Sequence, residues 1–171
     1  MISGNLVEDC VYCDFSDEAN ELFSKNQLGV HENKKLVLSL IESAYVLDKE
    51  KISIKSGRKT MDFESFFKKA SKKEENFRIK YIVFKDMRDR GYIVKTALKF
   101  GADFRVYDRG VKPGEDHAIW VVFPVSNSTK FSWSDFAAKT RVAHSTKKRL
   151  LIALVDEESD VTYYEIAWKR P

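Results

Sequence analysis

The chain has 171 residues, 43% of them hydrophobic, which is enough for one compact domain or two small ones without disulfide or metal support. No apolar run reaches the ~20 residues of a membrane span, and the first residues lack the basic start and apolar centre of a signal peptide, so we expect a cytoplasmic protein without a membrane partner. The net charge of +4 divides unequally, because residues 1–76 hold 12 Lys/Arg and 14 Asp/Glu (net −2) whereas residues 77–171 hold 18 and 12 (net +6).

The unequal charge favours a polyanionic partner for the second half. Clustered lysines and arginines gain affinity for phosphates by releasing counterions. A mildly basic, well-solvated surface would give the same count, so charge alone does not decide between the two interpretations.

Short strands and helices alternate in the first half. A strand is expected at Asn5–Tyr12, and a helix at Asp17–Lys25, which has acids in its first turn and Lys at its end. The segment Leu36–Leu47 has almost no polar face, which predicts a buried helix. Lys51–Lys55 alternates like a strand.

The last helix of the first half is expected after Thr60, which could cap it, and its apolar side would carry Phe63, Phe66, Phe67 and Ala70. It ends in the charged run Lys72–Glu75, where we place the domain boundary. The chain then consists of a small N-terminal α+β domain, 1–76, and a second domain, 77–171.

Cys10 and Cys13 have the Cys-x-x-Cys spacing of many zinc and redox sites. A structural zinc site needs about four ligands, and the chain has no other cysteine. Ordinary strand cysteines are therefore expected, with a metal or redox role as the less favoured alternative.

The second half opens with a helix from Phe77 to about Asp89, broken by Gly91, and a further helix to about Phe100 with Gly101 as its C-cap. Strands are expected from Phe104 to Tyr107 and over His117–Phe123, which is dense in β-branched and aromatic residues from Ile119 onward.

A helix capped by Ser132 and running through Ala143 follows. The chain then closes with strands at Arg149–Val155 and Val161–Trp168. This order predicts a mixed sheet flanked by helices, an α+β domain.

Tyr107 and His117 flank a loop with turn signals at Gly110 and Pro113-Gly114, so they should lie side by side at the mouth of a hairpin. A Tyr and a His that flank a loop are more often packing residues than catalytic residues. Lys148, at the end of a basic segment, adds a cation. A phenol, an imidazole and an ammonium group suit cleavage of an RNA phosphodiester by its own 2′-hydroxyl, because the reaction needs a base, an acid and a charge stabiliser.

The stretch from Lys80 to Gly110, followed by His117 and Arg141–Lys148, resembles the catalytic domain of the archaeal tRNA-intron (tRNA-splicing) endonucleases. That family's catalytic Tyr, His and Lys are separated by 10 and 31 residues, as are Tyr107, His117 and Lys148 (117 − 107 and 148 − 117). The resemblance is strong over 77–171 and extends to 1–76 only in the order of helices and strands. It implies a restriction-endonuclease-like catalytic fold.

The resemblance also implies a reaction. The enzyme would cut precursor tRNA at both intron boundaries in a bulge-helix-bulge fold, without metal or cofactor, and leave 2′,3′-cyclic phosphate and 5′-hydroxyl ends. Tyr107 would be the base, His117 the acid and Lys148 the stabiliser. A phenol of pKa ~10 is a poor base at neutral pH, so a cation such as Arg109 or Lys148 should assist.

RNA contacts are expected from three cations, Arg141, Arg109 and Lys147, and the resemblance implies that Arg141 stacks on a flipped base. A helix-surface cation is the alternative for Arg141. His144 is a second imidazole close to Lys148, but the family pattern assigns it no catalytic role. We expect His144 to lie near a phosphate or to be an ordinary residue at the end of a helix.

Two active sites at a fixed separation are needed to choose bulged RNA by shape, so an oligomer is implied, either a homotetramer or a complex with a second endonuclease subunit. Four acids cluster between the last two strands: Asp156, Glu157, Glu158 and Asp160. They suit a solvated turn. The resemblance implies instead that this loop enters a basic pocket of a neighbouring subunit while the last strands pair.

Two other functions fit parts of this sequence. A metal-dependent nuclease of the restriction type needs an acidic residue followed by Asp/Glu-x-Lys; the plain Glu-x-Lys here, Glu32–Lys34, lies in the first half, and no Pro-Asp precedes it. A non-catalytic, architectural RNA-binding subunit could use the same aromatic and Arg residues, but the complete triad favours an enzyme.

Overall fold

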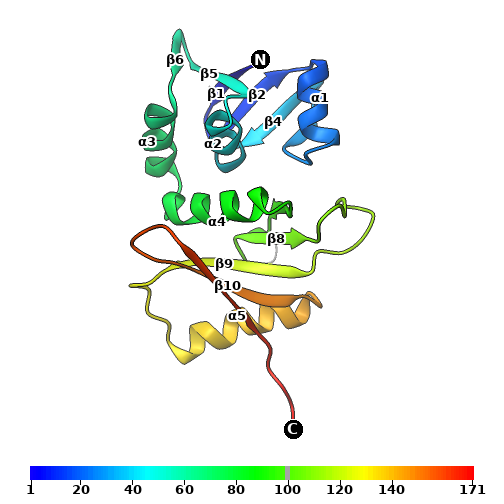
Figure 1. The fold of residues 1–171 in the computed structure, drawn as a ribbon, viewed down its shortest axis with the longest axis vertical. Coiled ribbons are helices and arrows are strands. Elements are labelled where there is room, and N and C mark those ends of the chain that lie inside the picture. Colours follow the sequence, from blue (N-terminus) through cyan, green and yellow to red (C-terminus); the bar gives the residue numbers. More distant parts are fainter. Residues whose placement is uncertain (99–100) are drawn as a thin grey trace. The chain divides into compact units, whose positions relative to one another are not determined.

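A computed structural model describes residues 1–98 and 101–171. They form two compact units, Met1–Tyr81 and Ile82–Pro171, each built on a sheet of its own (Figure 1). The division falls within helix α4 (Phe77–Asp89), whereas the sequence places the domain boundary just before that helix. Helices and mixed sheets in both units confirm the α+β class.

The first unit contains a six-stranded sheet of order β3-β4-β2-β1-β5-β6. Its strands are β1 (Ile2–Val7), β2 (Cys10–Asp14), β3 (Val30–Glu32), β4 (Lys35–Ser39), β5 (Ile52–Ser56) and β6 (Lys59–Met61). Only β1 and β5 pair in parallel among these strands. Helices α1 (Asp17–Ser24), α2 (Leu40–Asp48) and α3 (Phe63–Lys73) complete the unit.

The single strand expected at Asn5–Tyr12 is wrong, because the segment is a hairpin. Val7 pairs with Cys10 across a two-residue turn, and Glu8 adopts φ +49° there. Such tight hairpin turns need left-handed backbone, which favours Gly, Asn and Asp; Glu8 is none of these, so the local sequence signals this turn only weakly.

The long helix expected at Leu36–Leu47 is also wrong in its first third, which is strand β4. A short apolar run fits a buried strand as well as a buried helix. The helix starts after Ser39, whose side chain accepts from the Glu42 backbone N–H while the Glu42 carboxylate accepts from the Ser39 backbone N–H. This capping box was readable as Ser-x-x-Glu.

The other elements expected in the first half are present, with small differences at their ends. Helix α1 and strand β5 are confirmed, whereas β3 and β6 are additional short strands. Helix α3 is capped by Asp62, whose carboxylate accepts from Ser65 N at 2.8 Å, rather than by Thr60, which lies in β6.

The second unit contains a five-stranded sheet of order β11-β10-β9-β8-β7. Its strands are β7 (Ile93–Thr96), β8 (Phe104–Tyr107), β9 (Trp120–Ser126), β10 (Arg149–Val155) and β11 (Val161–Ile166). Strands β9 and β10 are parallel and are linked by helix α5 (Trp133–Ser145); the other pairs are antiparallel. Figure 1 shows α4 and α5 on opposite faces of this sheet.

Strand alternation explains the two covered faces. Phe104 points towards α4, where its ring centre lies 5.9 Å from that of Phe84. Val121 and Leu150 point the other way and share a buried cluster with Ala143 of α5. Burying both faces gives the central strands continuous apolar runs.

In the second half, the helix over Phe77–Asp89, the Ser132 cap of α5 and the strand Arg149–Val155 are confirmed. The expected further helix to Phe100 is wrong over Ile93–Thr96, which form β7, since the β-branched pair Ile93-Val94 suits a buried strand. The remainder of that expected helix includes residues 99–100, which lie outside the described residues.

Candidate active site

The end of β8 and the starts of β9 and β10 lie together at one end of the second sheet. Because β8 runs antiparallel to β9, Tyr107 at the end of β8 lies beside the start of β9. Because β10 runs parallel to β9, its start lies there too, with Arg149 opposite Trp120. Two 2.9 Å backbone hydrogen bonds connect the three strands there, from Ile119 N to Val106 O and from Arg149 N to Ile119 O. Neighbouring strands are about 4.8 Å apart, so the three strand ends together span only about 10 Å.

Tyr107 is buried on the α5 side of the sheet, with only 5% of its surface exposed. Its ring packs with Ile93 and Ala118, and Val111 of the following loop folds back onto them. The guanidinium carbon of Arg105, two residues earlier on the same face, lies 5.9 Å from the ring centre. The phenol is therefore held by packing on several sides.

His117 lies in the loop between β8 and β9, and its side chain is exposed. Strand β9 begins three residues later than the expected start at His117. The His117 backbone N–H donates to Asp116 Oδ1 at 2.7 Å, and the next residue, Ala118, is buried against Tyr107. The structure thus brings the loop end that carries the imidazole to the tyrosine.

Lys148 is positioned by the C-terminus of α5. Its N–H donates to Ala143 O at 2.9 Å, and the N–H of Lys147 donates to His144 O at 3.1 Å. Lys147 itself has φ +54°. This is a Schellman motif with lysine in place of the usual glycine, and it fixes the backbone of Lys148 directly before β10. The Lys148 ammonium donates to Thr146 O at 3.0 Å.

The three cations expected to bind RNA lie on different elements. Arg141 is exposed on α5, and its Nε donates to Ala137 O at 3.3 Å. Arg109 lies over the ring of Tyr92, 5.0 Å from its centre, whereas the guanidinium over the ring of Tyr107 belongs to Arg105. Lys147 is exposed beside Lys148.

His144, the second imidazole, belongs to the last turn of α5. Its ring centre lies 4.5 Å from that of Trp168, near the C-terminus. This contact joins the helix end to the segment that follows β11.

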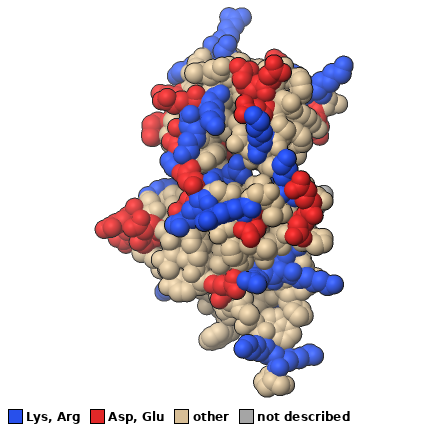
Figure 2. All heavy atoms as spheres, turned by 45° about the vertical axis from the view of Figure 1, so that its right-hand side comes forward, with Lys and Arg blue, Asp and Glu red and all other residues tan. Residues whose placement is uncertain are grey.

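The acidic turn between β10 and β11 is organised by Asp156. Its Oδ1 accepts from the N–H groups of Glu158 and Asp160, each at 2.9 Å. Glu157, Glu158 and Asp160 are exposed. Figure 2 shows acidic side chains gathered in a projecting cluster on the side where this turn projects in Figure 1.

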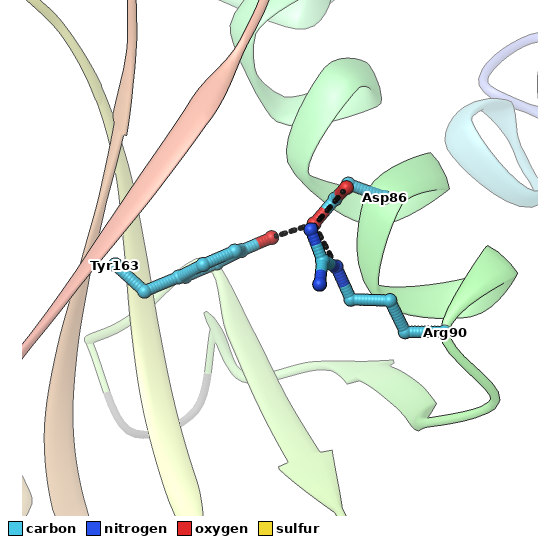
Figure 3. Close-up of polar contacts among 3 residues, drawn as sticks. All are labelled: Asp86, Arg90 and Tyr163. Carbon is cyan, nitrogen blue, oxygen red and sulfur yellow. Dashed lines mark hydrogen bonds and ion pairs between the residues drawn. The ribbon is translucent and has the colours of Figure 1, made fainter.

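A partly buried polar contact holds β11 to α4 (Figure 3). The Tyr163 hydroxyl donates to Asp86 Oδ2 at 2.7 Å, and Arg90 Nε donates to the same oxygen at 2.8 Å. Burial, and then the hydrogen bond to Asp86, raise the pKa of Tyr163 well above its usual range. Sequence reasoning missed this contact: Asp86 and Arg90 have the spacing of a helical ion pair, but nothing local points to Tyr163.

Cys10 and Cys13 lie three residues apart on β2, so their side chains point to opposite faces of the sheet. Burial raises the pKa of the Cys13 thiol to about 11, and burial also raises the pKa of Cys10. Neither thiol is in a disulfide. In the described part of the chain, no three His, Cys, Asp or Glu side chains are grouped so as to hold a metal ion.

No helix among the described residues is both long and apolar enough to cross a membrane.

Comparison with known proteins agrees with both units. Residues 77–163 match the tRNA intron endonuclease catalytic C-terminal domain, and residues 2–67 match the N-terminal domain of the same family. A tRNA-splicing endonuclease of Thermococcus onnurineus is 44% identical over 167 residues, which cover 98% of this chain and 96% of that protein. One from Pyrococcus furiosus is 43% identical over 170 residues, 99% and 98% of the two chains.

A tRNA-splicing endonuclease of Nanoarchaeum equitans is 44% identical over 140 residues, 78% of this chain and 90% of that one. These matches confirm the resemblance seen in the sequence and the expectation of an endoribonuclease. The chain belongs to the tRNA intron endonuclease family.

Proposed function

We propose that this chain cuts precursor tRNA at both intron boundaries, in a bulge-helix-bulge fold, by transesterification without a metal ion. The observation that supports the proposal is that β8 ends where β9 and β10 start, which brings the backbone of Tyr107, His117 and Lys148 to the same end of the sheet. The 77–171 segment is the catalytic domain in this account, 1–76 is the N-terminal domain, and the site of action is the cytoplasm.

Each residue of the triad has one task. Tyr107, acting as a phenolate, takes the proton of the 2′-hydroxyl and becomes a phenol, while the 2′-oxygen attacks the adjacent phosphorus. As the bond from phosphorus to the 5′-oxygen breaks, the His117 imidazolium gives that oxygen a proton. Lys148 stabilises the extra negative charge on the pentacoordinate phosphate. The products are a 2′,3′-cyclic phosphate and a 5′-hydroxyl.

RNA contacts outside the triad come from Arg141, Arg109 and Lys147. Arg141 is exposed along α5, one element before Lys148, and a guanidinium plane stacks well on an unpaired base. Lys147 is exposed at the left-handed position of the helix end and directly precedes Lys148. Each removed cation should weaken binding and reduce its salt dependence.

The active enzyme is an oligomer in this proposal, either a homotetramer or a complex with a second endonuclease subunit. Strand β11 is at the edge of its sheet, so its outer edge is available for pairing with a second copy. The exposed acids Glu157, Glu158 and Asp160 would enter a basic pocket of a neighbouring subunit and fix the separation of two active sites.

Product analysis tests the proposal. The purified protein is incubated in EDTA with a precursor tRNA carrying the bulge-helix-bulge fold and with a variant whose bulges are closed by base pairs. We expect two cuts in the first RNA only, with cyclic phosphate and 5′-hydroxyl ends. Ends with a 5′-phosphate, or cleavage only after a divalent metal is added, would contradict the mechanism. Binding without cleavage would favour an architectural subunit.

A further inference from the structure

A carboxylate on the outermost strand connects the two strand starts that flank the site. Glu165 of β11 accepts a hydrogen bond from Trp120 Nε1 at 2.8 Å, and its other oxygen lies 3.6 Å from Arg149 Nη1. Trp120 is the first residue of β9 and Arg149 the first of β10. One side chain therefore holds both strand starts from the side.

Trp120 and Arg149 form the terminal residue pair of β9 with β10, at the end of the sheet where the proposed active site lies. Trp120 and Arg149 are opposite one another, and beyond them one backbone hydrogen bond, from Arg149 N to Ile119 O, continues the ladder. Terminal pairs of a ladder open most readily. A side-chain contact at this register thus has more influence than one at the centre of the sheet.

The two residues next to this register belong to the proposed triad. Lys148 directly precedes Arg149, and His117 is three residues before Trp120. We propose that Glu165 is a positioning residue which, by joining Trp120 to Arg149, fixes the spacing between His117 and Lys148. The inference rests on the function proposed above, and it gives the edge strand a role in the site of its own subunit.

The hydrogen bond to Trp120 contributes more than the ion pair. The side chains of Arg149 and Glu165 are 70% and 45% exposed, and exposed pairs of this kind contribute little because water and salt screen them. A charged acceptor makes the bond to the indole N–H stronger than a neutral one. The ring of Trp120 is also held by Tyr92, at a centre distance of 5.5 Å.

Four variants test the proposal: Glu165→Ala, Glu165→Gln, Trp120→Phe and Tyr163→Phe. The single-turnover cleavage rate at saturating precursor tRNA, the RNA affinity, the melting temperature and the mass in solution are measured for each. Tyr163→Phe is the matched control, because the hydrogen bond that it removes joins the same strand to α4 rather than to β9 or β10.

We expect Glu165→Ala to lower the single-turnover rate about tenfold, since small displacements of catalytic groups cost that much or more, with less than a twofold change in RNA affinity. Glu165→Gln, whose amide oxygen can still accept from Trp120, should recover most of the rate. Trp120→Phe should match Glu165→Ala, and combining the two should add nothing, because they remove the same bond. Tyr163→Phe should melt earlier and cut at the normal rate.

A Glu165→Ala rate within twofold of the unmodified enzyme would overturn the proposal, as would an equal rate loss in Tyr163→Phe. If Glu165→Ala fails to fold or assemble, Trp120→Phe decides, because it leaves the edge strand intact. Failure of the proposed function gives a different result: the unmodified enzyme then does not cut, although the indole N–H resonance of Trp120 still moves when Glu165 is replaced.

Discussion

At the scale of single residues, the contact of Arg105 with Tyr107 restricts the phenol. The guanidinium carbon lies 5.9 Å from the ring centre, and the buried ring has packing partners on its other sides. We expect Arg105→Met, which keeps an apolar side chain but removes the planar cation, to slow cleavage about tenfold by letting the phenol oxygen drift. Single-turnover assays measure this.

The matched control for Arg105→Met is Arg58→Met, which removes an exposed cation from the first unit. It should leave the rate unchanged. Equal rates for Arg105→Met and the unmodified enzyme would show that packing alone orients Tyr107.

The hydroxyl of Tyr163 should make the free energy of unfolding depend on pH in the alkaline range. Its folded pKa is raised by burial and by Asp86, so its contribution is complete below the unfolded value of about 10 and is lost as pH rises above it. Tyr163→Phe should lower the free energy of unfolding by about 1–2 kcal/mol at pH 7, and the difference should shrink above pH 10. Urea unfolding at several pH values measures both. A difference that does not change with pH would contradict this assignment.

The proposed triad could be located in the sequence because Tyr107, His117 and Lys148 match the fixed intervals of a family motif. Contacts between distant residues could not. Glu165 meets Trp120 across 45 positions and Tyr163 meets Asp86 across 77, and neither pair has a local pattern, since only the sheet order brings them together.

At the scale of elements, helix α2 is fixed at its start by one buried carboxylate. Glu42, 8% exposed, accepts from Ser39 N at 3.0 Å, Ser39 Oγ at 2.9 Å and Gly29 N at 2.9 Å. Gly29 needs its small size, because a Cβ there would meet Val37 O at 2.7 Å. The carboxylate therefore ties the helix start to the turn before β3.

We expect Glu42→Ala to lower the free energy of unfolding by about 3 kcal/mol, because it removes a cap and leaves buried donors unsatisfied. Glu42→Gln, which keeps one acceptor oxygen, should lose less. Chemical unfolding measures both. Equal losses would mean that side-chain volume, rather than hydrogen bonding, explains the effect.

Elements with amphipathic pattern and clear caps were predictable, as α4 and the Ser132 cap of α5 show. Two errors arose where short apolar runs fit either a strand or a helix, at β4 and at β7. In both cases pairing with neighbouring strands decided the outcome, and this is tertiary information that a local pattern lacks.

At the scale of the whole molecule, the acidic turn is the feature through which assembly can be tested. Asp156 shapes the turn through its two backbone hydrogen bonds, so it is left in place. The combined change Glu157→Lys, Glu158→Lys and Asp160→Lys should give a folded chain that assembles poorly and cuts weakly, because the like charges repel a basic pocket. Light scattering and cleavage assays measure both effects.

A triple variant that keeps its native mass and its cleavage rate would show that the acidic loop is a plain solvated turn. The control carries Glu18→Lys, Glu21→Lys and Glu50→Lys in the first unit. These changes reverse the same amount of charge away from the turn, and we expect normal assembly.

The most direct test of the central claim compares chemistry with binding in His117→Ala. In EDTA, with precursor tRNA at saturation, the single-turnover rate should fall by about 10²–10⁴-fold. RNA affinity should stay within about twofold, because in the proposed mechanism the exposed imidazole acts on the leaving oxygen and contributes little to binding. A rate that is unchanged, or a rate and an affinity that fall together, would contradict the assignment of His117 as the general acid.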